Sequence, residues 1–273
     1  MGTLYEASQE IKSWITDQPV QEESLTDWML RYISKYKKNF HYYLFNKTQE
    51  ACNGADWLWC IKTNPYIYLF LVQAKKTKKT PSENYSGLNQ HNGDQIVNLL
   101  NEAKTKNLYP IYTFYTNENY QTKCGAPKID EGAFLASAYD IKKLFDAYGS
   151  KIKINSRLVN ATHTESLLNN CIGLSCLEDC PLCNSEDSHD FENFLTNYLV
   201  NKIEDFNTKL IDENSIYRYK QDEVPSYISA LPPMKPNGQG VSLPDWYQKE
   251  FSSQIQNLNG IVVFDFTKKT FDY

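Results

Sequence analysis

The fold is decided by the segment ADWLWCIKTNPYIYLFLVQAK, which spans residues 55–75. It holds two largely apolar runs, 55–61 and 66–74, on either side of an Asn64-Pro65 dipeptide that favours a turn. The second run is apolar at consecutive positions, which is typical of a central strand buried on both faces. The segment therefore predicts an antiparallel β-hairpin within a larger sheet.

Polar residues interrupt this hairpin at its open end. If the chain turns at Asn64-Pro65, Asp56 lies directly opposite Gln73, and opposed residues of a hairpin point to the same face. Lys75 is two residues further along the strand, so its side chain shares that face. The hairpin thus predicts an acid, an amide and a lysine close together, and a one-residue slip in register would separate them.

These three residue types suit phosphodiester hydrolysis. Carboxylate and amide oxygens are ligands that a hard divalent cation prefers, and a metal-bound water loses its proton more easily. A lysine ammonium can stabilise the negative charge that develops at the phosphate. Asp56, Gln73 and Lys75 are therefore a candidate hydrolytic site. The alternative interpretation is a surface lysine cluster beside a strand-end aspartate.

The pattern of apolar residues predicts further elements around the hairpin. Apolar residues recur at helical spacing over residues 24–36, 94–104, 134–146 and 190–211, which predicts four helices. Runs rich in aromatic and β-branched residues predict strands over 40–45, 110–115 and 260–266. The N-terminal half is therefore expected to run α-β-β-β-α-β-α.

Two motifs and this order of elements resemble a known superfamily. Gly54-Ala55-Asp56, followed by Val72-Gln73-Ala74-Lys75, resembles the PD-(D/E)XK nuclease motif in its Gln variant. The order helix, three-stranded meander, helix, strand is similar to the common core of that superfamily. The resemblance covers residues 20–145 and departs from the usual motif at Gln73, which replaces an acid and removes a negative charge from the metal site.

The resemblance implies a fold and a division of the chain. We expect an α/β restriction-endonuclease-like core over residues 1–150, with a mixed central sheet flanked by helices. Residues 151–273 are expected to form a helical or irregular extension that packs on this core and ends in a strand.

The resemblance also implies further site residues. Members often carry an acid on the first helix, where Glu23 is favoured over its neighbour Glu22, and some carry a Gln on the next helix, where Gln95 is favoured over Gln90. The expected catalytic residues are Glu23, Asp56, Gln73, Lys75 and Gln95. The expected ligands of Mg²⁺ or Mn²⁺ are Glu23, Asp56 and Gln73.

A closer resemblance concerns biological role. The strand Pro110-Ile-Tyr-Thr-Phe-Tyr115 and the motifs above are similar to those of restriction-like proteins from bacterial phage-defence loci. This implies a nuclease that acts on DNA in antiphage defence, as a homo-oligomer or under a regulatory partner. The alternatives are an RNase and a decayed nuclease fold that serves as a binding or adaptor module.

Charge and composition bound the partners. The net charge of −5 does not attract nucleic acid to the whole chain, so binding requires local cations. Lys76, Lys78 and Lys79 follow the second strand and either hold phosphates or form a solvated loop. No run approaches the roughly 20 apolar residues of a membrane helix, and residues 1–10 lack the apolar region of a signal peptide. We therefore expect a cytoplasmic chain with no membrane partner.

Four of the seven cysteines are clustered. Cys171, Cys176, Cys180 and Cys183 form C-x4-C-x3-C-x2-C, and four thiolates can bind structural Zn²⁺. Only the final pair has the common zinc-knuckle spacing. Free buried thiols are therefore favoured over a zinc site.

Overall fold

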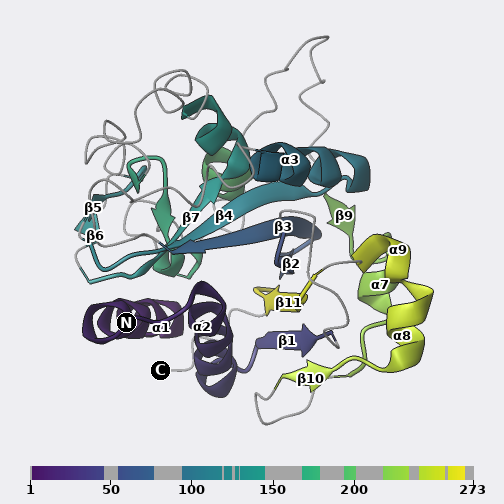
Figure 1. Cartoon of the computed structure of the whole chain (residues 1–273). Helices are drawn as coiled ribbons and strands as arrows, with labels where there is room; N and C mark the ends of the chain where they lie inside the picture. Colours follow the sequence, from purple (N-terminus) through teal and green to yellow (C-terminus); the bar gives the residue numbers. More distant parts are fainter. Residues whose placement is uncertain are drawn as a thin grey trace.

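A computed structural model describes residues 2–45, 55–76, 94–118, 120–124, 127–128, 130–144, 168–178, 194–200, 218–233, 240–255 and 258–267. They form an α/β fold in which helices flank a mixed, nine-stranded central sheet (Figure 1). The sheet consists of β1 (Phe40–Leu44), β2 (Trp57–Lys62), β3 (Tyr66–Lys76), β4 (Tyr109–Tyr115), β7 (Ala133–Ser137), β8 (Ile172–Gly173), β9 (Tyr219–Lys220), β10 (Val241–Ser242) and β11 (Gly260–Asp265). The short strands β5 (Tyr120–Gln121) and β6 (Pro127–Lys128) pair with each other.

The predicted hairpin is present in its predicted register. Strands β2 and β3 pair antiparallel, with Trp57 opposite Val72 and Lys62 opposite Ile67. Strand β3 then pairs parallel with β4, and helix α3 (Asp94–Lys106) lies on the connection between them. The hairpin is thus the centre of a mixed sheet, as its apolar sequence predicts.

Helices bury both faces of β3. Tyr68, Phe70 and Val72 pack in one cluster with helices α1 (Thr3–Asp17) and α2 (Glu22–Tyr36). Ile67, Leu69 and Leu71 alternate with them and pack with α3 and with α7 (Ser226–Ser229), α8 (Asp245–Glu250) and α9 (Ser252–Ile255). Figure 1 shows α1 and α2 on the side of the sheet opposite α3. Because side chains alternate along a strand, Gln73 and Lys75 belong to the α3 face and Lys76 to the α2 face.

The C-terminal strand occupies the middle of the sheet. Strand β11 lies between β1 and β2, antiparallel to the first and parallel to the second. The expected meander of three adjacent strands is therefore interrupted, and the C-terminal part is not merely an extension packed on residues 1–150. Gly260 allows this insertion, since a Cβ there would lie 2.0 Å from the Tyr43 carbonyl oxygen.

Two helices differ from the sequence prediction. The segment expected to be helical over 134–146 begins with strand β7, and the helix starts only at residue 138. Residues 133–137 are all buried, and a run apolar on both faces fits a strand as well as a helix. Helix α1 was not predicted, although Leu4, Ala7 and Ile11 are buried at helical spacing. Of the helix predicted over 190–211, only residues 194–200 are described, and they are helical, ending in a π-type turn.

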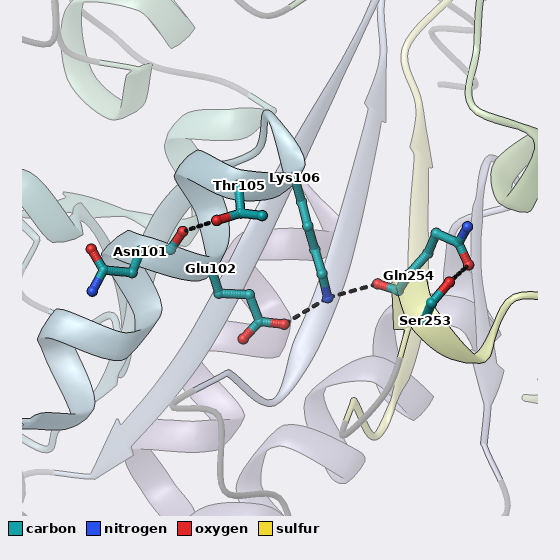
Figure 2. Close-up of polar contacts among 6 residues, drawn as sticks. All are labelled: Asn101, Glu102, Thr105, Lys106, Ser253 and Gln254. Atoms are coloured by element: carbon teal, nitrogen blue, oxygen red, sulfur yellow. Dashed lines mark hydrogen bonds and ion pairs between the residues drawn. The ribbon is translucent and has the colours of Figure 1, made fainter.

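Helix α3 is bonded at its C-terminal end to helix α9. Lys106 Nζ donates to the Gln254 carbonyl oxygen at 2.8 Å and pairs with Glu102 at 2.6 Å (Figure 2). The C-terminal segment therefore helps to place α3, whose other end carries Gln95. No helix in the described ranges has the length and apolar character needed to cross a membrane.

Candidate active site

Asp56 lies at the open end of the hairpin, immediately before β2. Its backbone N–H donates to the Val72 carbonyl at 2.8 Å, which continues the hairpin register by one residue. Its Oδ2 atom accepts hydrogen bonds from Gln73 Nε2 at 2.7 Å and from the Ala74 N–H at 2.8 Å. The structure therefore brings Asp56 and Gln73 together as the sequence predicts.

Gln73 connects the hairpin to α3. Its side chain is 3% exposed, and its Nε2 also lies 3.1 Å from the Ala74 carbonyl oxygen. Its Oε1 accepts a hydrogen bond from Gln95 Nε2, in the first turn of α3, at 3.3 Å. The remaining amide oxygen of Gln95 is buried and has no hydrogen-bond partner among the described residues. Gln95 thus presents an unsatisfied acceptor beside the Asp56–Gln73 pair.

Lys75 is a buried cation, with 6% of its surface exposed. Its positive charge lowers the pKa of Glu22, because the ammonium stabilises the ionised form of that carboxyl group. A buried ammonium is costly unless opposite charges compensate it. The carboxyl groups at the end of the hairpin are suited to that role.

The acid that α2 brings to the site is Glu22, whereas the sequence interpretation favoured Glu23. Glu22 Oε2 accepts a hydrogen bond from the Lys76 N–H at 2.6 Å, while Glu23 is exposed to solvent. Adjacent helical residues point about 100° apart, so only one of the two can face the sheet. Glu22 precedes Leu25 and Met29 by three and seven residues, and both are buried. Glu23 stands at the same spacing from Thr26 and Leu30, which are also buried, so the helical pattern alone does not choose between the two acids.

Burial dominates the electrostatics of Glu22. Desolvation raises its pKa to about 7, since Lys75 and the Lys76 N–H only partly offset the loss of water, and Asp56 and Glu23 raise it further. The carboxyl group is therefore partly protonated near neutral pH. Behind it, Tyr115 and Thr26 share a hydrogen bond of 2.8 Å, and burial raises the pKa of Tyr115.

Of the three lysines considered either as phosphate contacts or as part of a solvated loop, the structure describes Lys76. Its Nζ donates to the Val20 carbonyl oxygen at 2.5 Å, between α1 and α2. It points to the α2 face because it is one residue away from Lys75, and it ties β3 to those helices. Lys78, Lys79 and the alternative Gln90 lie outside the described residues.

The cysteine cluster is only partly described. Cys171 and Cys176 are buried free thiols that belong to two different core clusters, and Cys180 and Cys183 lie outside the described residues. Cys176 Sγ lies 3.8 Å from Cys124 Sγ, and burial raises the pKa of the Cys171 thiol. The two described thiols thus pack in different core clusters, and the zinc hypothesis also involves residues outside the described ranges.

The residues at the end of the hairpin fit a hard cation. They offer the carboxylates of Asp56 and Glu22 and the unsatisfied amide oxygen of Gln95. Such oxygen donors suit Mg²⁺ or Mn²⁺ rather than Zn²⁺. Within the described ranges, no three His, Cys, Asp or Glu residues gather as a metal-binding group, so a cation held here would have two carboxylates and otherwise neutral ligands.

The raised pKa of Glu22 predicts a pH-dependent stability. The carboxyl group has an ordinary pKa of 4.5 and a folded value of about 7, so the fold favours its protonated form. The contribution of Glu22 to stability is then fully present below pH 4.5 and is lost as the pH rises through 7. Relative to Glu22→Gln, we expect the wild type to lose roughly 1 to 3 kcal/mol of unfolding free energy between pH 5 and 8.

Urea unfolding in EDTA at several pH values measures this difference. The matched control is Glu23→Gln, which alters the exposed neighbour and should follow the wild-type pH dependence. Parallel pH curves for wild type and Glu22→Gln would show that Glu22 is not desolvated at this site.

Comparison with known proteins finds one family. A family model with the description "Family of unknown function (DUF6615)" matches residues 3–270. The match includes α1, the hairpin and strand β11. No curated protein and no solved structure matches the chain.

Proposed function

We propose that this chain, which belongs to the DUF6615 family of unknown function, is a metal-dependent nuclease with a restriction-endonuclease-like core. The observation that carries the proposal is the gathering of Asp56, Gln73 and Lys75 at the end of one hairpin. Glu22 from α2 and Gln95 from α3 complete the group. Phosphodiester hydrolysis by a metal-dependent enzyme needs such oxygen ligands and a cation together.

Each residue has a distinct task in this proposal. Asp56 and Glu22 hold Mg²⁺ or Mn²⁺, with the Gln95 amide oxygen as a neutral ligand. The bound metal supplies Lewis acidity and lowers the pKa of a coordinated water. Lys75 places its ammonium beside the scissile phosphate and stabilises the negative charge that develops there. The Ala74 N–H keeps the Asp56 carboxylate in place, so little reorganisation is needed during the reaction.

The arrangement of elements is a second argument for the proposal. Helix α2, the β2–β3 hairpin, helix α3 and the parallel strand β4 follow one another along the chain, as in the core that the motifs suggest. The insertion of β11 between β1 and β2 is a departure from that core. It lies on the side of β2 away from β3 and leaves the hairpin intact.

DNA is the proposed substrate and antiphage defence the proposed role, on the strength of the motif resemblance. An active nuclease damages its own host unless it is controlled. We therefore propose regulation by self-association or by a partner of the defence system. Plaque counts on cells that express the chain or its Asp56→Ala variant test this role.

The direct test is incubation of purified protein with plasmid, linear DNA or RNA. We expect nicking or cleavage of DNA with Mg²⁺ or Mn²⁺ and none with EDTA, because the carboxylates need the metal to act on water. Asp56→Ala protein, purified in parallel, controls for contaminating nucleases. Cleavage that persists in EDTA would contradict the metal mechanism, and cleavage of RNA alone would favour an RNase.

One observation favours a second candidate, a decayed nuclease fold that binds nucleic acid or a partner. Asp56 Oδ2 already accepts two hydrogen bonds, and Gln73 contributes no charge to the site. DNA binding with equal affinity in Mg²⁺ and EDTA, without cleavage, would favour this candidate.

A further inference from the structure

We propose that Gln73 is a positioning residue that holds the Asp56 carboxylate with a neutral hydrogen bond, rather than a metal ligand. The role assigned to Gln73 in hydrolysis rests on the proposed function. The hydrogen bonds themselves do not, because they join residues of the chain to one another.

The orientation of the Gln73 amide follows from its neighbours. The Ala74 carbonyl oxygen can only accept hydrogen bonds, and Asp56 Oδ2 already accepts one from the Ala74 N–H. Both oxygens lie near the same Gln73 nitrogen, at 3.1 and 2.7 Å. The NH₂ group must therefore face them. The amide oxygen consequently points to Gln95, whose Nε2 donates to it at 3.3 Å. That oxygen is occupied by Gln95 and directed away from Asp56.

An acid at position 73 would create a different site. The carboxylate that Gln73→Glu introduces would face Asp56 Oδ2 at a similar distance, and two carboxylates so close repel each other or share a proton. Such a pair needs a bound cation or a shared proton to be stable, whereas the amide donates a hydrogen bond to the Asp56 carboxyl group and needs neither. Gln73 stands where the superfamily motif usually has an acid. The amide thus yields a site that is organised before a metal binds.

Substitutions at positions 56 and 73 test whether the Gln73 amide stabilises the Asp56 carboxyl group. Gln73→Glu should lower the unfolding midpoint in EDTA at pH 8 by at least about 3 °C, because it places two carboxylates in contact. Asp56→Asn combined with Gln73→Glu removes the repulsion between two charges but does not restore the hydrogen bond, because the introduced amide oxygen must still accept from the Ala74 N–H and cannot donate to the introduced carboxylate. This double variant should therefore unfold at a higher temperature than Gln73→Glu, which carries two charges, and at a lower temperature than Asp56→Asn alone, which keeps the Gln73 donor. Saturating Mg²⁺ should raise the midpoint of Gln73→Glu more than that of wild type.

The outcomes separate this proposal from the proposed function. A Gln73→Glu protein as stable as wild type in EDTA would overturn the positioning role, and so would a double variant no more stable than Gln73→Glu. If Gln73→Glu does not fold, recovery of folded protein by the double variant supports the proposal and its failure contradicts it. A wild type that neither cleaves DNA nor gains stability from Mg²⁺ would defeat the nuclease, but the measurements in EDTA would still decide the role of Gln73.

Discussion

Replacing Asp56 with alanine is expected to abolish metal-dependent cleavage, with a rate at least about 10³-fold below that of wild type. The variant loses the only carboxylate that the hairpin contributes to the site. Stabilisation of several kcal/mol by a bound metal corresponds to a rate effect of about this size. Initial rates of plasmid nicking in Mg²⁺, compared at equal concentrations of folded protein, measure the loss.

Loss of the fold must be separated from loss of chemistry. Asp56→Ala leaves the Gln73 and Ala74 donors without their acceptor, which costs about 1 to 3 kcal/mol for each buried group. Asp56→Asn is the matched control, because its amide oxygen can still accept from the Ala74 N–H. We expect it to be folded and inactive. Wild-type cleavage by Asp56→Asn would show that the Asp56 charge has no role in catalysis.

The local part of the site could be predicted from the sequence because it depends on the hairpin. Pairing in a hairpin fixes every opposed residue once the turn is known, so Asn64-Pro65 was enough to place Asp56 against Gln73. Alternation along β3 then placed Lys75 on the same face. Gln95 was implied only by the family resemblance, and its hydrogen bond to Gln73 places it beside the hairpin residues.

The sequence predictions that differ from the structure concern features that short-range patterns do not determine. Glu22 and Glu23 are adjacent acids, and the choice depends on how α2 turns its buried side toward the sheet. Residues 133–137 form a strand because β4 and β8 pair with them, and both partners are distant in sequence. Strand β11 is apolar enough for a central position, but its neighbours β1 and β2 lie some 200 residues earlier. Nothing local specifies that pairing.

Lys75 is expected to have the second largest effect on cleavage. Lys75→Ala should lower the rate by about 10² to 10³, by analogy with the loss of one positioned donor to a developing charge. The effect should fall on kcat, because that charge appears in the transition state. Single-turnover rates of plasmid nicking at saturating protein isolate this step from binding.

The structure offers a matched control at the other end of the same hairpin. Lys62 is the last residue of β2 and lies next to the turn, far along the strand from Asp56. Lys62→Ala removes one positive charge from the hairpin, as Lys75→Ala does, and should leave the cleavage rate unchanged. An equal loss in both variants would mean that Lys75 acts through overall charge and not at the phosphate. A Lys75→Ala protein that cleaves at the wild-type rate would remove the lysine from the proposed mechanism, even if Asp56 proves essential.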